Sequence, residues 1–206
     1  MAFGNDGGSS SEMDTGQRGR GSNIILVGVM GSGKSTIGER LAYYVGFGFI
    51  DVDKQIERRE RKSVADIFAQ KGEDYFRNAE HQTISDLSKA RNQVISVGGG
   101  AVMADDNWQI LKGMGTVVWL NTPPTEIARR FVMKPDDIRS RPLLKDLVEI
   151  EDKSDRQKKL TDRLAALIAQ RQSRYSEANV VLEISYSTAE TSAQLLKAML
   201  TREGLL

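Results

Sequence analysis

A glycine-rich loop between an apolar segment and a helix constrains this chain more than any other feature. The run Gly28–Thr36 reads GVMGSGKST and fits the pattern G-x-x-x-x-G-K-[ST], and the apolar residues Ile24–Val27 lead directly into it. Glycines let successive backbone N–H groups turn toward a phosphate chain, Lys34 brings a positive charge to the β- and γ-phosphates, and Ser35 offers a hydroxyl to Mg²⁺. Residues 36–45 can form a helix whose positive end faces those phosphates. The sequence therefore predicts a nucleoside triphosphate-binding protein.

Composition indicates one α/β domain over residues 23–206. The chain has 206 residues, enough for a substantial core, and 29 basic and 28 acidic residues give a net charge of +1. This balance provides no basic surface for nucleic acid or membrane. There are no cysteines, which is compatible with a reducing compartment, and no apolar run approaches the ~20 residues of a membrane span. Residues 1–22 are rich in Gly and Ser and are expected to be a disordered leader.

Short apolar segments alternate with longer periodic ones after residue 22. The expected strands are 24–29, 47–52, 94–97, 116–120 and 180–184. The expected helices after the first are 56–62, 63–70, 74–90, 105–112, 125–132, 155–176 and 189–201. This alternation predicts a parallel sheet with helices on both faces, and such sheets bind ligands beyond the carboxyl ends of their strands.

Two aspartates and three glycines follow the predicted strands. Asp51 and Asp53 point the same way if the chain is still extended there, so one could hold a water of Mg²⁺ and the other could accept a proton from a hydroxyl. The alternative is a polar strand end that caps the next helix. The third strand runs into Gly98–Gly100, which favours Asp51 as the metal-side acid and allows close approach to a small ligand.

Three arginines are candidates for binding an anionic acceptor, and the alternative for each one taken singly is a solvated surface side chain. Arg77 is followed three residues later by Glu80, which could orient its guanidinium or form an ordinary surface pair. Arg171 and Arg174 lie near the end of the long predicted helix. Since arginine can bind a carboxylate through two hydrogen bonds, two arginines converging with Asp53 would suit an acceptor that carries a carboxylate and hydroxyls.

The segment over about residues 133–154 is expected to be irregular and strongly charged. Long irregular segments in compact domains are usually functional or disordered. A phosphoryl-transfer enzyme needs a lid that excludes water and can supply an arginine, so the segment is interpreted as a lid.

Taken in order, these segments resemble the shikimate kinases, a family with the nucleoside-monophosphate-kinase-like P-loop fold. The resemblance extends over about residues 23–184 and rests on GVMGSGKST, DVDKQIE, SVADIFAQKGEDYFRNAE, VISVGGG, RPLL and RQSRY. The first segment occurs in many nucleotide-binding proteins, whereas the combination is specific. The resemblance implies a three-layer α/β/α fold with a five-stranded parallel sheet and a mobile lid.

The same resemblance implies transfer of the γ-phosphoryl group of MgATP to the 3-hydroxyl of shikimate, by a cytoplasmic monomer. Asp53, Lys34 and Arg141 would be catalytic, and Ser35 and Asp51 would serve Mg²⁺. The ATP site would comprise Gly31, Ser32, Gly33, Lys34, Ser35, Thr36, Arg130 and Arg141. The shikimate site would comprise Asp53, Arg77, Gly98, Gly99, Gly100 and Arg171.

Three questions stay open from the sequence. The lid is longer than in the bacterial relatives, so the roles of Arg139 and Arg141 are not distinguished. Another small-molecule kinase of this fold, such as a gluconate-type kinase, would keep the phosphate-binding loop without the arginine pair. A non-catalytic nucleotide-binding relative would be expected to lose Lys34, Asp53 or an acceptor arginine, and none is lost here.

Overall fold

A five-stranded, wholly parallel sheet organises the structure, a computed structural model that describes residues 23–185 and 187–206. The predicted leader, residues 1–22, lies outside the described residues. The strand order is β2-β3-β1-β4-β5. The strands are β1 (Asn23–Val27), β2 (Gly48–Asp51), β3 (Gln93–Ser96), β4 (Gly115–Asn121) and β5 (Val180–Glu183). The predicted three-layer α/β/α fold is confirmed.

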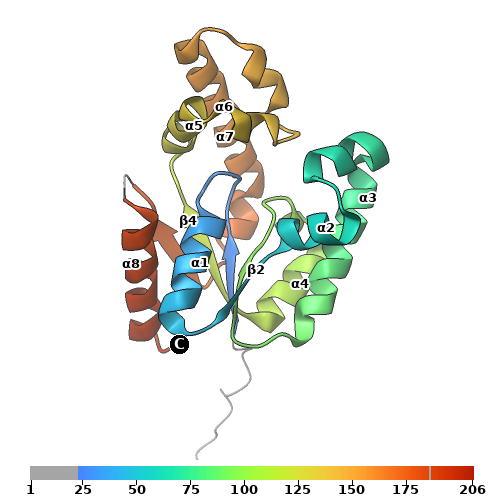
Figure 1. Ribbon diagram of the computed structural model, residues 1–206. Helices are drawn as coiled ribbons and strands as arrows, with labels where there is room; N and C mark the ends of the chain where they lie inside the picture. Colours follow the sequence, from blue (N-terminus) through green and yellow to red (C-terminus); the bar gives the residue numbers. More distant parts are fainter. Residues whose placement is uncertain (1–22, 186) are drawn as a thin grey trace, which may run out of the picture.

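Helices cover both faces of the sheet (Figure 1). They are α1 (Lys34–Val45), α2 (Val52–Glu60), α3 (Val64–Asp86), α4 (Asp105–Met114), α5 (Pro124–Met133), α6 (Pro135–Arg139), α7 (Lys153–Tyr175) and α8 (Ala189–Arg202). Short 3₁₀ turns are η1 (Leu87–Lys89), η2 (Ala101–Met103) and η3 (Lys145–Glu149). Among the residues described, no helix is both long and apolar enough to cross a membrane.

The central strand β1 contributes to a separate core on each face, because side chains alternate along a strand. Ile24 and Leu26 pack with α1 and α8, whereas Ile25 and Val27 pack with α2, α3 and α4. All five residues of β1 are buried, as expected for the middle of a parallel sheet covered on both sides. The loop that follows β1 therefore starts from a fixed point.

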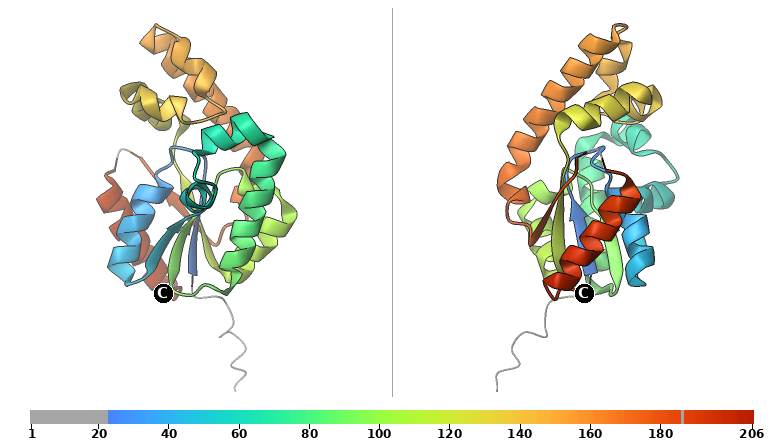
Figure 2. Two further views of the ribbon diagram at one scale, coloured as in Figure 1. Left: turned by 45° about the vertical axis from the view of Figure 1, so that its right-hand side comes forward. Right: turned by 90° about the vertical axis from the view of Figure 1, so that its left-hand side faces the viewer.

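A third apolar cluster lies above the sheet, in the lid (Figure 2). Ile138, Leu144 and Leu147 of the lid pack against Leu160 and Leu164 of α7. The prediction of an irregular segment over 133–154 is therefore wrong in detail, because α6 and η3 occupy part of it. Isolated apolar residues in this charged segment carry too little periodicity to reveal such short helices.

Two predicted boundaries differ for local reasons. Val52 was expected to end a strand, but it begins α2, because the Asp51 carboxylate accepts a hydrogen bond from the Lys54 N–H and caps the helix. The chain is therefore not extended from Asp51 to Asp53. The helices predicted at 63–70 and 74–90 form the two parts of α3, which are separated by a break at Gly72 (φ 83°, ψ 173°).

Helix α1 packs closely against the sheet at Gly38. A Cβ at Gly38 would lie 2.6 Å from Phe49 Cε2 and 2.9 Å from Leu26 Cδ1. We expect Gly38→Ala to lower the free energy of unfolding by about 1–3 kcal/mol through overpacking, although alanine favours helix formation. Urea denaturation measures this change.

Gly113 of α4 is the matched control, since a Cβ there would meet no described heavy atom within 4 Å. Gly113→Ala should leave stability unchanged or raise it by up to about 1 kcal/mol. Equal effects of the two substitutions would contradict the packing argument.

Candidate active site

A cleft of about 630 Å³ lies beyond the carboxyl ends of β1, β2 and β3. Its lining includes nearly all of the site residues predicted from the sequence: Gly31, Gly33, Lys34, Ser35, Thr36, Asp51, Asp53, Arg77, Gly98, Gly99, Gly100, Arg130, Arg141 and Arg171. Ser32 is the exception, because it is fully buried outside this lining. The topology brings these residues together as the parallel sheet requires.

The loop between β1 and α1 depends on left-handed glycine conformations. Gly31 has φ 77° and Gly33 has φ 98°, values that other residues adopt at a cost. Close packing adds to this requirement, since a Cβ at Gly31 would lie 2.6 Å from Ile127. The loop therefore leads directly into the N-terminus of α1, where backbone N–H groups can bind a phosphate.

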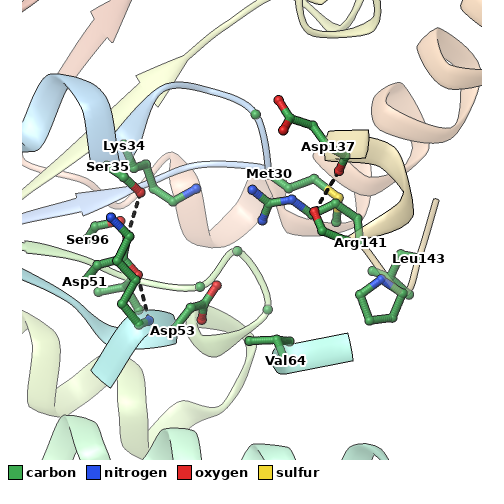
Figure 3. Close-up of a pocket in the computed structure, with 18 of the residues that line it drawn as sticks. Met30, Lys34, Ser35, Asp51, Asp53, Val64, Ser96, Asp137, Arg141 and Leu143 are labelled. Carbon is green, nitrogen blue, oxygen red and sulfur yellow. Dashed lines mark hydrogen bonds between the residues drawn. The ribbon is translucent and has the colours of Figure 1, made fainter. Parts of the chain in front are cut away.

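Lys34 is the cation of this loop. Its Nζ donates hydrogen bonds to the carbonyl oxygens of Gly28 (2.8 Å) and Val29 (3.0 Å). The pKa of Lys34 is lowered to about 8, chiefly by burial; the charge of Asp53 opposes this shift, and that of Arg141 contributes to it. Figure 3 shows Lys34, Asp53 and Arg141 directed toward the same part of the cleft. The ammonium group of Lys34 is therefore fixed at the cleft, where an anionic ligand such as a phosphate could bind it.

Ser35 and Asp51 form a pair of oxygen ligands. The Ser35 hydroxyl donates a hydrogen bond to Asp51 Oδ2 at 2.5 Å (Figure 3). The other oxygen of this carboxylate, Asp51 Oδ1, accepts a hydrogen bond from the Lys54 N–H and thereby caps α2. Both readings of Asp51 made from the sequence are therefore compatible. One hydroxyl and one carboxylate suit Mg²⁺, which keeps several waters and binds few protein ligands, so these residues fit the ion.

Asp53 lies in the first turn of α2, and its Oδ1 is buried with no hydrogen-bond partner within the described part of the chain. Burial raises the pKa of this carboxyl, and the negative charge of Asp51 raises it further, whereas Lys34 and Arg141 lower it. A buried carboxylate with a raised pKa is a stronger base than an exposed one. Asp53 therefore has the chemistry expected of a proton acceptor.

Arg77 is held between two carboxylates of α3. Its Nη1 donates to Glu80 Oε2 at 2.8 Å and its Nη2 donates to Glu73 Oε1 at 3.0 Å. The Glu80 side chain is only 1% exposed, and burial raises its pKa to about 7. The surface-pair interpretation of Arg77 and Glu80 is therefore wrong. The three-residue spacing alone does not determine that Glu80 points inward.

The triple glycine lets three sets of charged side chains approach the backbone. A Cβ at Gly98 would lie 2.6 Å from Glu80 Oε1 and 3.0 Å from Asp53 Oδ1. At Gly99 it would lie 2.7 Å from Arg171 Nη1, and at Gly100 it would lie 2.7 Å from the guanidinium nitrogens of Arg77. The sequence predicts that a ligand can approach the backbone of Gly98–Gly100 closely. The structure shows that the protein's own charged side chains also approach this backbone.

Arg171 and Arg174 have different surroundings, although they are only three residues apart on α7. Arg171 is 7% exposed, lines the cleft and has an Nη1 atom without a hydrogen-bond partner among the described residues. Arg174 lies outside the cleft lining and forms ion pairs with Asp105 and Glu177. Only Arg171 is therefore placed to contact a ligand in the cleft.

The structure also separates the two lid arginines. Arg141 lines the cleft, and its Nε is buried without a hydrogen-bond partner in the part of the chain described. The Arg139 side chain is 66% exposed and pairs with Asp136 instead. Of the two lid arginines, only Arg141 therefore lines the cleft.

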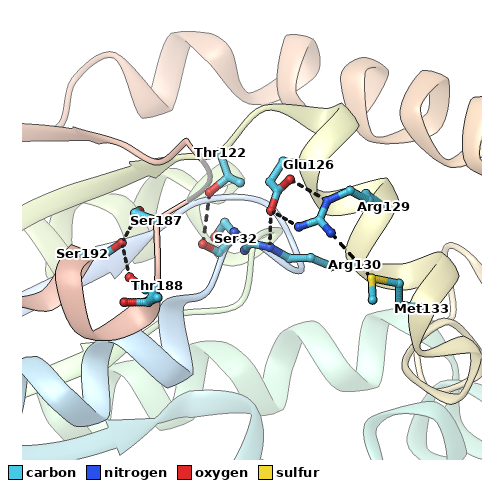
Figure 4. A network of polar contacts seen from close by, with 9 residues as sticks. All are labelled: Ser32, Thr122, Glu126, Arg129, Arg130, Met133, Ser187, Thr188 and Ser192. Atoms are coloured by element: carbon cyan, nitrogen blue, oxygen red, sulfur yellow. Dashed lines mark hydrogen bonds and ion pairs between the residues drawn. The ribbon is translucent and has the colours of Figure 1, made fainter.

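On α5, Arg130 and Arg129 both form hydrogen bonds with Glu126 (Figure 4). Arg130 Nε donates to Glu126 Oε1 at 3.0 Å, and Glu126 also accepts two hydrogen bonds from Arg129. The Glu126 side chain is 3% exposed, so this buried carboxylate holds both guanidinium groups in place. Arg130 lines the cleft at its α5 side.

Unpartnered polar atoms concentrate in this cleft. Over the described residues, four buried atoms without a hydrogen-bond partner belong to its lining, namely Asp53 Oδ1, Glu80 Oε1, Arg141 Nε and Arg171 Nη1. Buried polar atoms are seldom left unpaired, because the loss costs about 1–3 kcal/mol each. Their charges suit a ligand that carries both hydroxyls and anionic groups.

Comparisons with known proteins agree with this geometry. Residues 30–201 match the model of the shikimate kinase family. A shikimate kinase of Chloroherpeton thalassium is 42% identical over 162 residues, covering 77% of this chain and 81% of its own. One of Persephonella marina is 45% identical over 139 residues, covering 67% and 82%.

Solved structures give the same result. Shikimate kinase from Acinetobacter baumannii in complex with shikimate superimposes with a TM-score of 0.76 and 31% identity, covering 91% of this chain and 97% of that one. Shikimate kinase from Aquifex aeolicus superimposes with a TM-score of 0.68 and 32% identity, covering 89% and 98%.

The fold and the cleft define an ATP-dependent P-loop kinase that uses Mg²⁺. Within that class, the chain belongs to the shikimate kinase family. The interpretation from the sequence is thus confirmed over the gluconate-type and non-catalytic alternatives.

The lowered pKa of Lys34 predicts how nucleotide binding depends on pH. Below about pH 8 the lysine is charged, and above it the neutral form predominates before phosphate binds. We expect the Kd for MgATP to be flat below pH 8 and to rise by up to about tenfold per pH unit above it.

Equilibrium titrations between pH 7.5 and 9.5 measure this dependence. Lys34→Met is the control, because it should bind more weakly at every pH and show no such rise. A wild-type Kd that stays constant across the range would contradict the assignment.

Proposed function

We propose that this chain transfers the γ-phosphoryl group of MgATP to the 3-hydroxyl of shikimate, with the acceptor held between Asp53 and two arginines. The observation that carries this proposal is the convergence of opposite charges at Gly98–Gly100, where Asp53 lies near Gly98, Arg171 near Gly99 and Arg77 near Gly100. The unpartnered atoms of Asp53 and Arg171 match an acceptor with a carboxylate and several hydroxyls.

The acceptor is oriented by its carboxylate. Arg171 offers a buried, unpartnered N–H, and Arg77 is already aligned by Glu73 and Glu80. Asp53 accepts the proton of the attacking hydroxyl through its buried carboxylate. A bond then forms between the hydroxyl oxygen and the γ-phosphorus, the bond to ADP breaks, and the proton remains on Asp53.

The donor side supplies positive charge. Lys34 and Arg141 offset negative charge on the phosphates, the loop from Gly31 to Thr36 cradles them, and Arg130 packs against the adenine. Ser35 and Asp51 hold Mg²⁺, which when bound neutralises phosphate charge. Little covalent chemistry is required of the protein, since the transition state is loose.

We propose further that the enzyme is a monomer in the cytoplasm. Every residue assigned a role comes from one chain, and the donor ATP is abundant in that compartment. Sedimentation equilibrium tests the first point against a chain mass of 22.8 kDa.

The two aspartates are distinguished by substitution. Asp53→Asn should keep MgATP binding but lower kcat by at least about 10²-fold, because the proton acceptor is lost. Asp51→Asn, the matched variant, should mainly raise the Mg²⁺ concentration needed for half-maximal activity. A coupled ADP-release assay with shikimate measures both effects. Exchange of the two phenotypes would reverse the roles.

The arginines are distinguished by their kinetic effects. Arg171→Ala should raise the KM for shikimate by about ten- to a hundredfold, since a charged hydrogen bond is lost, and leave the KM for ATP near normal. Arg141→Ala should instead lower kcat, because a lid arginine acts on the transferring group.

Arg174→Ala is the control, which should keep both KM values while lowering thermal stability through its lost ion pairs with Asp105 and Glu177. A raised KM for shikimate in Arg174→Ala but not in Arg171→Ala would contradict the assignment of Arg171 to the acceptor site.

A further inference from the structure

Tyr175 lies behind the acceptor site as part of the sheet's core. It is the last residue of α7, is fully buried, and stacks on Trp119 of β4 with ring centroids 5.4 Å apart and planes inclined by 22°. It does not line the cleft. A phenylalanine would fill this position equally well, so the hydroxyl requires a separate explanation.

The hydroxyl is directed at two groups of the acceptor site. It donates a hydrogen bond to the carbonyl oxygen of Gly99 at 3.4 Å, and the guanidinium of Arg171 lies close enough to lower the pKa of the phenol. Arg171 precedes Tyr175 by four residues, which places both side chains on one face of the helix. A Cβ at Gly99 would lie 2.7 Å from Arg171 Nη1 and 3.6 Å from the Tyr175 oxygen.

Chemistry allows only one direction for these hydrogen bonds. A carbonyl oxygen only accepts hydrogen bonds, so the Tyr175 hydroxyl donates its proton to Gly99. A guanidinium only donates, so the phenol oxygen of Tyr175 is the atom that can accept from the N–H groups of Arg171. Burial raises the pKa of the phenol, although Arg171 opposes this, so the hydroxyl keeps its proton. One oxygen, already bonded to the glycine backbone, is therefore able to accept a hydrogen bond from the arginine.

The end of α7 is also fixed from outside. Glu177, just after the helix, accepts hydrogen bonds from the indole N–H of Trp108 at 2.8 Å and from Lys112 at 3.1 Å, while Arg174 pairs with Asp105. All three partners come from α4. These contacts with α4 hold the end of α7 that carries Tyr175, so the Tyr175 hydroxyl has a fixed position from which it can orient Arg171.

We propose that Tyr175 is a positioning residue for shikimate binding, whose hydroxyl holds the Arg171 guanidinium against Gly99 so that Nη1 faces the acceptor carboxylate. This inference rests on the proposed role of Arg171. It gives the hydroxyl a function that packing alone does not provide. Tyr175, which does not line the cleft, thus contributes to the affinity for the acceptor.

The test is a double-mutant cycle of wild type, Tyr175→Phe, Arg171→Ala and the double variant. Tyr175→Phe keeps the stacked ring and removes only the hydroxyl. We expect it to raise the KM for shikimate by about 3- to 10-fold, the loss of one hydrogen bond, with the KM for ATP unchanged. Values of kcat/KM for shikimate complete the cycle, because they need no saturation. In the Arg171→Ala background the same substitution should have no further effect.

Tyr44→Phe is the matched control, since the Tyr44 hydroxyl also makes a 3.4 Å contact, to Gln194, on the opposite face of the sheet. It should change neither KM. An unchanged shikimate KM in Tyr175→Phe, or an equal loss with and without Arg171, overturns the positioning role alone. If Arg171→Ala itself leaves kcat/KM for shikimate unchanged, the proposed acceptor site and this inference both fail.

Discussion

The approach of charged side chains to the backbone of Gly98–Gly100 is the constraint on which the rest of the acceptor site depends. A Cβ on any of these glycines would lie within 3.0 Å of a charged side chain, and the side chains concerned are those of Glu80, Asp53, Arg171 and Arg77. The three glycines follow β3, a central strand, so the backbone they offer is fixed by the sheet. Helices α2, α3 and α7 bring their charges to this one point. Without glycine there, the charges could not converge.

Burial sets the electrostatics of the cleft. It lowers the pKa of Lys34 to about 8 and raises that of Glu80 to about 7, since each charged form loses solvation. Charges of opposite sign offset this loss only in part, and Glu80 keeps a buried oxygen, Oε1, without a hydrogen-bond partner among the described residues. A site of this kind gives up some stability of the folded protein for charges that are already in place when substrates bind.

Helix α7 joins the two halves of the enzyme. Its first half contributes Leu160 and Leu164 to the lid cluster, and its last turns carry Arg171 and Tyr175 to the sheet (Figure 2). Helix α7 therefore carries Arg171 and also supports the lid segment to which Arg141 belongs. Within the lid, α6 and η3 pack on α7 and α5 through apolar side chains.

Much of this protein follows from the sequence, because local patterns suffice for it. The apolar run before Gly28, the glycine spacing and the helix after it predict β1, the loop and α1, and strand alternation predicts the parallel sheet. Boundaries were less certain, since the Asp51 cap converts Val52 from strand to helix. The sequence also places Arg77 three residues before Glu80, and Arg171 three residues before Arg174. Only the tertiary structure decided that Glu80 and Arg171 point inward, because a helix pattern gives the angle between side chains, while packing against the sheet decides which face is buried.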